Sequence, residues 1–324
     1  MPSNRPESLR EFLEAWESLF KQHDVKLFVV QDTDEPWDFD TPVEFEARSR
    51  KQVPGFIPVG TDMIRSWGMY LAWRHHAPYV LTLDDDVRPI SDFDPFEAYE
   101  QEFERGSVSS RFLSVGALTT SDLQMRGFPY RERKRAKVAI QYGGWNGVLD
   151  FDAATQLSAQ PGTAFFRHIV MPVPRGVPVT TCIMNAAWRV EYTPIMWQLP
   201  MLQGKYNRFG DIWSGLFQKR VLDIIGDVML VNGRASVEHE RASDPIKNLE
   251  REQPGIYFNE QIADIVFDSA MPIPNVEDGS ALIGDSRTLT TYRAVTAWAS
   301  AIFPDDYRAH FLSARDQWLA LFDG

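Results

Sequence analysis

The chain has 324 residues, of which 44% are apolar and 24% charged, a composition typical of a globular protein with a substantial core. Its 45 acidic and 33 basic residues give a formal net charge of −12, which argues against a duplex-binding protein, and we expect no nucleic acid partner. One cysteine, Cys182, excludes an internal disulfide and a cysteine-rich zinc site, and no apolar run is long enough for a membrane span, so we expect a cytoplasmic protein.

The first predicted element is a helix that begins after Pro6. Apolar side chains recur there at helical spacing, with charges between them: Leu9, Phe12, Leu13, Trp16, Leu19 and Phe20. The short apolar run Lys26–Val30 predicts a buried strand, and polar residues up to Asp34 follow it. The segment from Glu35 to Pro58 is rich in proline and charge, which predicts a loop with at most an uncertain strand.

The next two predicted elements lead to a run of carboxylates. Residues Met63–Trp73 predict a second helix, and Tyr79–Leu83 predict a second strand. The three acids Asp84–Asp86 follow that strand directly. Helices that alternate with strands indicate an α/β fold, in which ligands bind outside the carboxyl ends of the strands.

The rest of the chain divides into a mixed middle and a helical end. Residues 107–200 combine short β-like runs with glycine and proline. A helix is predicted over Asp211–Ile225 and a short strand over Asp227–Val231. Two more helices, near 288–303 and 305–322, predict a C-terminal helical extension, so we expect a catalytic domain over 1–260 with an extension over 261–324 packed on it.

The acidic triplet is the strongest chemical signal. Side chains alternate along an extended chain, so Asp84 and Asp86 point to the same side and offer hard oxygen ligands to Mg²⁺ or Mn²⁺. Three interpretations remain open at this point. The triplet fits the Asp-x-Asp site of a nucleotide-sugar glycosyltransferase, the nucleophile motif of a haloacid-dehalogenase phosphatase, or a solvated acidic turn.

Several other segments resemble one family, in the same order along the chain. That family is the reversibly glycosylated polypeptides, or UDP-arabinopyranose mutases. The segments that carry the resemblance are Phe12–Trp16, Val29–Asp34, Asp84–Asp86, Arg126–Arg133 (similar to RGYPFSLR), Trp145, Asp150–Leu157 (similar to DYDAPTQL), Cys182–Ala187 (similar to CGMNLA), Arg208–Gly215 (similar to RYDDMWAG) and His239–Pro245 (similar to HSKASNP).

The resemblance implies a GT-A-like fold with a mixed central sheet flanked by helices, a UDP-sugar ligand and a divalent metal, Mn²⁺ or Mg²⁺. It also implies a pyranose–furanose mutase, or a self-glycosylating or retaining glycosyltransferase with an unknown sugar acceptor, and a homo-oligomer. The family has an apolar strand before the point where Met1–Arg5 stand here, so we expect the first strand to be short or missing.

The resemblance also implies roles at a metal and nucleotide site. Asp84 and Asp86 are the candidate metal ligands, and His239 is the third. Asp32 is expected to accept a hydrogen bond from the uracil imide, with a turn residue of the Asx type as the alternative. The remaining candidates for contact with the nucleotide-sugar are Arg5, Arg65 and Asp85. The two arginines are expected near the diphosphate or the rim of the base, with surface charge as the alternative.

Further candidates concern the sugar and the leaving group. Residues 126–137 carry six cations that could hold a diphosphate, with a solvated charged loop as the alternative. Within them the resemblance implies catalytic roles for Arg126, as a charge that faces the leaving group, and for Arg133. Asp211 is expected to be a carboxylate on the catalytic face, with a helix N-terminal acid as the alternative. Asn185 is expected to contact sugar hydroxyls, and the alternative is a buried structural amide.

Tryptophans are the candidates for an apolar wall against the sugar, Trp145 first and then Trp188 and Trp213, with core packing as the alternative. Two other functions compete with the enzyme interpretation. A UDP-sugar-binding subunit without activity is suggested by Gly210, which replaces an aspartate of the family segment, and by the short first strand. A phosphatase is less favoured, because no convincing lysine partner for Asp84 is apparent.

Overall fold

A computed structural model of the chain describes residues 1–41, 43–91, 93–113, 115–119, 123–148, 150–159, 167–200, 208–273 and 286–323. The strands are β1 (Pro2–Ser3), β2 (Leu27–Gln31), β3 (Phe45–Ser49), β4 (Tyr79–Leu83), β5 (Val87–Pro89), β6 (Ser107–Val108), β7 (Arg135–Ala136), β8 (Val138–Gly147), β9 (Val170–Pro172), β10 (Asn185–Arg189) and β11 (Val228–His239). The α-helices are α1 (Pro6–Gln22), α2 (Arg65–Arg74), α3 (Pro95–Arg105), α4 (Ala153–Ala159), α5 (Gly210–Ile225), α6 (Pro245–Val266), α7 (Ser286–Ala299) and α8 (Asp305–Ala320).

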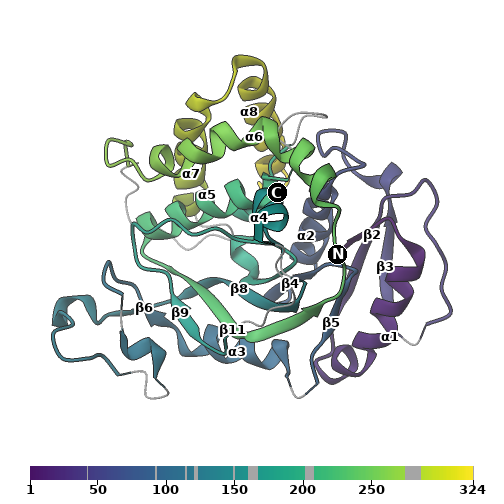
Figure 1. Cartoon of the computed structure of the whole chain (residues 1–324), viewed down its shortest axis with the longest axis horizontal. Helices are drawn as coiled ribbons and strands as arrows, with labels where there is room; N and C mark the ends of the chain where they lie inside the picture. The colour runs from purple at the N-terminus through teal and green to yellow at the C-terminus, as the bar shows by residue number, and fades with distance from the viewer. Residues whose placement is uncertain are drawn as a thin grey trace.

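Two sheets form the centre of the molecule, with helices on both of their sides (Figure 1). One is a parallel sheet of order β1-β2-β3. The other is a mixed sheet with the path β4-β10-β8-β11-β5, in which β9 also pairs with β11. The strands β6 and β7 form a separate two-stranded antiparallel sheet. The predicted α/β class is therefore confirmed at the level of mixed sheets covered by helices.

Most of the predicted elements are present, and the structure adds elements that were not predicted, among them the helices α3 and α6. The strand β3 lies inside the stretch expected to be mainly loop, and it completes the parallel sheet. The strand β11 is much longer than its predicted five residues and runs on to His239. Its register against β8 shifts between Asn232 and Val237, and such an irregularity hides the alternation that identifies a strand from sequence.

The largest apolar cluster joins the middle of the chain to its C-terminal helices. Trp197 stacks on Phe311 of α8 with ring centroids 5.7 Å apart, and the Trp318 indole N–H donates to the Pro194 carbonyl at 2.7 Å. Both tryptophans are fully buried. The boundary predicted at residue 260 falls within α6, and the helices after it share this core with β10 and α5. Of the helices in the described ranges, none is both long and apolar enough to cross a bilayer.

Candidate functional site

The acidic triplet lies at the carboxyl end of β4, and each of its carboxylates has a different partner. The Asp84 Oδ1 atom accepts a hydrogen bond from Arg65 Nη2 at 2.5 Å, and that arginine is buried at the start of α2. Asp85 is buried, accepts from the Ser3 hydroxyl at 2.6 Å and is paired with Arg5. Burial raises the pKa of Asp85, against the opposing effects of Ser3 and Arg5.

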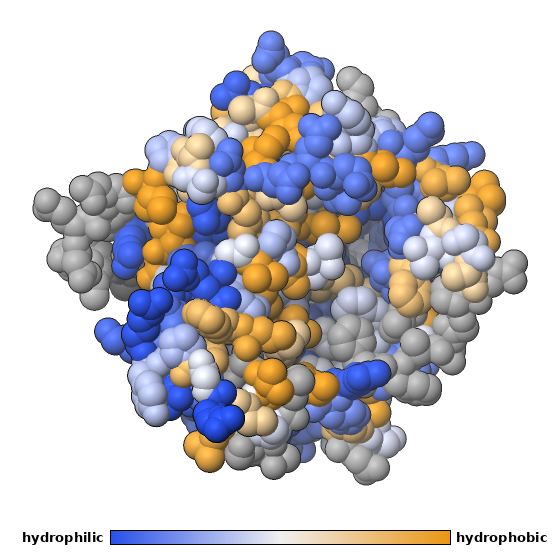
Figure 2. Space-filling model, turned by 60° about the vertical axis from the view of Figure 1, so that its left-hand side comes forward, coloured by the Kyte–Doolittle hydropathy of each residue, from blue (hydrophilic) through white to orange (hydrophobic). Residues whose placement is uncertain are grey.

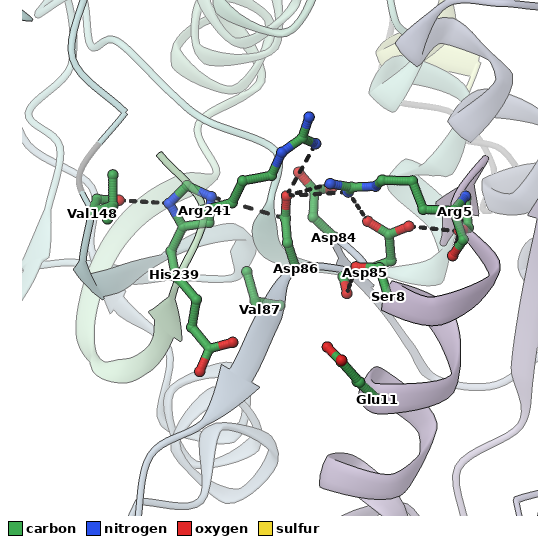
Figure 3. A network of polar contacts seen from close by, with 12 residues as sticks. Arg5, Ser8, Glu11, Asp84, Asp85, Asp86, Val87, Val148, His239 and Arg241 are labelled. Atoms are coloured by element: carbon green, nitrogen blue, oxygen red, sulfur yellow. Dashed lines mark hydrogen bonds and ion pairs between the residues drawn. The ribbon is translucent and has the colours of Figure 1, made fainter. Parts of the chain in front are cut away.

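Asp86 lies at a meeting point of three cationic or imidazole side chains (Figure 3). Arg5 Nη2 is 3.1 Å and Arg241 Nη1 is 3.8 Å from Asp86 Oδ2. The His239 Nε2 atom is 3.9 Å from Asp86 Oδ1, because His239 ends β11 directly opposite Val87 of β5. The other ring nitrogen, Nδ1, lies 2.5 Å from the Val148 carbonyl, to which it can only donate, so a neutral His239 turns the lone pair of Nε2 toward Asp86.

This arrangement bears on the predicted metal ligands. The described residues contain no group of three His, Cys, Asp or Glu side chains placed to hold one ion, since Asp84 is turned to Arg65. Asp86 and His239 do face each other, at a separation longer than a hydrogen bond. Their donor chemistry, one carboxylate and one oriented imidazole, fits Mn²⁺ or Mg²⁺ when substrate oxygens supply further ligands.

A second group of acids lies close to the triplet. Asp211, at the start of α5, accepts from the Ile183 and Ile212 amides at 3.3 and 3.0 Å. Asp150 pairs with Arg208 at 3.2 Å, and Asp62 stands just before α2. The surrounding protein, and then the charges of Asp62 and Asp150, raise the pKa of Asp211 to about 7. This carboxyl group is therefore poised to exchange a proton at neutral pH.

We expect the Asp211 carboxyl to titrate near pH 7 in the folded protein, measured by carbon NMR of labelled aspartate. Asp62→Asn removes the largest neighbouring charge and is expected to lower that midpoint by about half a unit or more. Because the folded state holds this proton more tightly than the unfolded state, stability falls as the pH rises from 3.8 toward about 7. Asp211→Asn is expected to remove the part of this loss of stability that the Asp211 carboxyl group causes.

The exposed Asp316 on α8 provides the control for this titration, because Asp316→Asn should leave the Asp211 midpoint unchanged. A midpoint near 4 in the unaltered protein would contradict the proton-exchanging role.

The residues predicted for the nucleotide occupy the ends of β1, β2 and β4. Asp32 follows β2, and its Oδ2 atom accepts from the Gly60 amide at 2.7 Å. Its Oδ1 atom is buried and has no hydrogen-bond partner. A buried acceptor without a donor is costly, so this oxygen is suited to a donor supplied by a ligand. Arg5 and Arg65 are both committed to the triplet, as described above.

Asn185 does not fit its predicted contact with sugar hydroxyls. Its side chain is fully buried, and its amide group donates to the Gly144 and Ala235 carbonyls at 2.9 and 2.7 Å. The Tyr99 hydroxyl donates to its Oδ1 atom at 2.9 Å. Asn185 is thus a structural amide that joins β10 to β8, β11 and α3, because its amide nitrogen and its amide oxygen both have hydrogen-bond partners inside the core.

Of the three tryptophans predicted to line the sugar, two lie in the core and one is half-buried. Trp188 and Trp213 are fully buried, and their indole N–H groups donate to Thr193 and Asn259. They belong to the core, so neither forms a wall for a sugar. Trp145, on β8, is half-buried against the apolar cluster beneath α1, and a contact with sugar stays a prediction for it alone.

The structure does not bring Arg126 and Arg133 to the triplet. Their segment lies at the far left of Figure 1, whereas β4 and β5 lie at the centre and right. Arg126 is exposed, and Arg133 donates to the Phe128 carbonyl at 3.0 Å and lies over the Tyr130 ring at 4.0 Å. On the face that this side of the molecule presents, apolar and hydrophilic residues are interspersed (Figure 2). The predicted contact with a leaving group has no support from this position.

Four residues near the site received no role from the sequence: Asp62, Asp150, Arg208 and Arg241. Asp150, Arg208 and Arg241 lie in segments that resemble the family, and that signal was sufficient to single them out. Asp62 lies outside those segments, and only the fold brings it to Asp211.

The sequence of this chain matches a protein family and several known proteins. The family model described as reversibly glycosylated polypeptide matches residues 3–279, which confirms the resemblance seen in the sequence. Probable UDP-arabinopyranose mutase 2 of Solanum tuberosum is 28% identical over 283 residues, covering 82% of this chain and 75% of the relative. UDP-arabinopyranose mutase 1 of Oryza sativa subsp. japonica is 27% identical over 281 residues, with 81% and 75% coverage. UDP-arabinopyranose mutase 3 of Arabidopsis thaliana is 27% identical over 270 residues, with 78% and 73% coverage.

Proposed function

The chain belongs to the reversibly glycosylated polypeptide family, and from this premise we propose that it is a UDP-sugar mutase that exchanges the pyranose and furanose forms of a sugar. One observation carries the proposal. Carboxylates of two kinds meet outside the carboxyl ends of β2 and β4, where α/β folds bind their ligands. The carboxylates of the first kind, Asp85 and Asp86, are paired with Arg5. The carboxyl group of the second kind, that of Asp211, has a pKa of about 7.

The nucleotide is proposed to lie at the ends of β1, β2 and β4, in a GT-A-like arrangement. The unpartnered Oδ1 atom of Asp32 accepts a hydrogen bond from the uracil imide N–H. Arg5 and Arg241 hold Asp86 between them and place positive charge beside the diphosphate. Asp86 and His239 are the side chains that would hold Mn²⁺ or Mg²⁺. The metal, when bound, neutralises charge that develops on the departing diphosphate.

The sugar is proposed to face Asp211 and Asp150. Cleavage of the bond between C1 and the diphosphate oxygen leaves the pair of electrons on UDP, and the same UDP oxygen later re-forms that bond. Between these events a second sugar hydroxyl loses its proton and forms a new bond to C1, while the bond from C1 to the original ring oxygen breaks and that oxygen gains a proton. A carboxyl group with a pKa near 7 can both give and take a proton at neutral pH, which suits Asp211 to this exchange.

The proposal is tested by incubating the protein with Mg²⁺ and UDP-arabinopyranose, UDP-glucose or UDP-galactose in separate samples, followed by proton NMR of the anomeric region. New furanose signals are expected from at least one sugar. They should vanish with Asp84→Asn, which weakens the pairing with Arg65, and persist with the control Asp316→Asn. Free UDP and sugar would instead indicate a transferase that lacks its acceptor.

The binding-subunit alternative predicts a different pattern, in which UDP-sugar binds measurably by calorimetry and every spectrum stays unchanged. Release of inorganic phosphate would indicate the phosphatase. Either result would overturn the mutase proposal.

A further inference from the structure

The Asp211 carboxyl group is oriented by two backbone amides that come from different parts of the chain. Its Oδ1 atom accepts from the Ile212 amide of α5 at 3.0 Å, and its Oδ2 atom accepts from the Ile183 amide at 3.3 Å. Ile183 belongs to the segment 181–183, which leads into β10. The position of this segment against α5 therefore decides whether the second amide reaches Asp211.

A glycine in α5 allows this close approach. Gly215 is buried and lies one helical turn after Asp211. A Cβ atom at this position would overlap the Thr181 hydroxyl and would stand 2.9 Å from both the Cβ and the Cγ2 atoms of Thr181, closer than side-chain carbons normally approach. The glycine weakens the helix by about 1 kcal/mol relative to alanine, but it lets Thr181 lie directly on α5.

Polar contacts hold Thr181 against the same face of the helix. Its side chain is buried, and its hydroxyl donates to the Asp211 carbonyl at 3.3 Å. Beside it, the buried Tyr142 hydroxyl of β8 donates to Gln218 Oε1, three residues after Gly215, at 2.6 Å. Burial raises the pKa of Tyr142, so this donor stays protonated at neutral pH. The start of α5 is therefore held both by β8 and by the segment that contains Thr181.

We propose that Thr181 and Gly215 are positioning residues for Asp211. Their contact sets the separation between the segment 181–183 and α5, and with it the direction in which the Asp211 carboxyl group faces the site. The effect of this contact on turnover rests on the proposed mutase function. Its effect on the carboxyl group does not, because the orientation of Asp211 is a property of the protein without substrate.

Other groups around Asp211 also influence its titration and must stay unaltered in a test of this contact. They are Asp62 just before α2, Arg65 at its start, Asp150 before α4, the Cys182 thiol and the Tyr142 hydroxyl. Burial raises the pKa of Cys182, so a small movement of this neutral thiol with the segment adds no charge near pH 7.

Gly215→Ala tests the contact, because the added methyl group overlaps Thr181 and moves the Ile183 amide away from Asp211. That amide stabilises the charged carboxylate, so its loss is expected to raise the Asp211 midpoint by about half a unit or more in carbon NMR. Turnover at saturating UDP-sugar should fall by about tenfold or more, with KM changed by less than about twofold.

Gly55→Ala is the matched control, since no atom of the residues that the structure describes would lie within 4 Å of the added carbon. Thr181→Gly supplies the rescue, because it removes the atoms that the methyl group at position 215 would meet. The double variant should return the midpoint to within about 0.2 units of the unaltered protein and recover most of the turnover. Thr181→Gly alone replaces the contact by a gap and is expected to raise the midpoint by less, which decides the question if Gly215→Ala does not fold.

A midpoint that neither single variant moves away from that of Gly55→Ala would overturn the proposal. A shift that the double variant fails to reverse would do the same, since Thr181 would then not be the partner of Gly215. A lower melting temperature with an unchanged midpoint would also overturn it, because the contact would then be only structural. A shifted and rescued midpoint in a protein that converts no UDP-sugar would support the proposal and contradict the mutase function.

Discussion

Asp86→Asn is expected to lower turnover of the UDP-sugar by about a hundredfold or more, the scale seen when one charged group is removed from a preorganised site. The change keeps the shape of the side chain but removes the charge that Arg5, Arg241 and His239 surround. It also removes the carboxylate proposed as a metal ligand. Initial rates at saturating UDP-sugar, followed by proton NMR, measure the effect.

Asp316→Asn is the matched control, since it makes the same chemical change on an exposed side chain of α8. The melting temperature of Asp86→Asn should stay close to that of the control, because Arg5 keeps its second partner, Asp85. A turnover within tenfold of the unaltered protein would remove Asp86 from the reacting site.

Lys219→Met is expected to destabilise the protein by about 3 kcal/mol or more, although the residue lies away from the site. Lys219 is only 1% exposed, pairs with Asp223 one helical turn later in α5, and donates to the Pro174 carbonyl at 3.0 Å. Without the ammonium group, the buried Asp223 carboxylate loses its ion pair with Lys219 and keeps the hydrogen bond from the Gly176 amide at 2.8 Å. Urea unfolding measures the loss.

The double variant Lys219→Met with Asp223→Asn separates this effect from simple loss of packing. The second substitution leaves a neutral side-chain amide whose oxygen can still accept from the Gly176 amide. We therefore expect the double variant to recover at least about half of the lost free energy of unfolding. If Lys219→Met alone lowers the free energy of unfolding by less than about 1 kcal/mol, the ion pair contributes little to stability.

The secondary structure was largely predictable because its signals are local. The spacing of Leu9, Phe12 and Trp16 indicates α1, and the apolar runs before Asp32 and Asp84 indicate β2 and β4. β3 carries no such run, since its sequence alternates charged and apolar residues at a sheet edge. The apolar core that the C-terminal helices share with the middle of the chain was not predictable either. Contacts such as that of Trp318 with Pro194 join residues far apart in sequence.

The site was predictable in its location and less so in its pairings. The triplet and His239 were identified, and β11 does bring His239 opposite Val87. The pairing of Asp86 with cations was not apparent from the sequence, since Arg5 and Arg241 come from distant segments. Asn185 and Arg126 show the limit in the other direction. A motif names a residue, whereas only the fold decides whether its side chain faces a ligand, the core or the solvent.

The burial of α8 in the main core has a consequence for synthesis on the ribosome. Trp197, Phe217 and Tyr70 find aromatic partners in Phe311 and Trp318, near the end of the chain. Until α8 has emerged from the ribosomal exit tunnel, those partners are missing and the largest apolar cluster stays open to water. The nascent chain must therefore be protected from aggregation up to that point, and we expect its yield in cells to depend on chaperones that bind ribosomes.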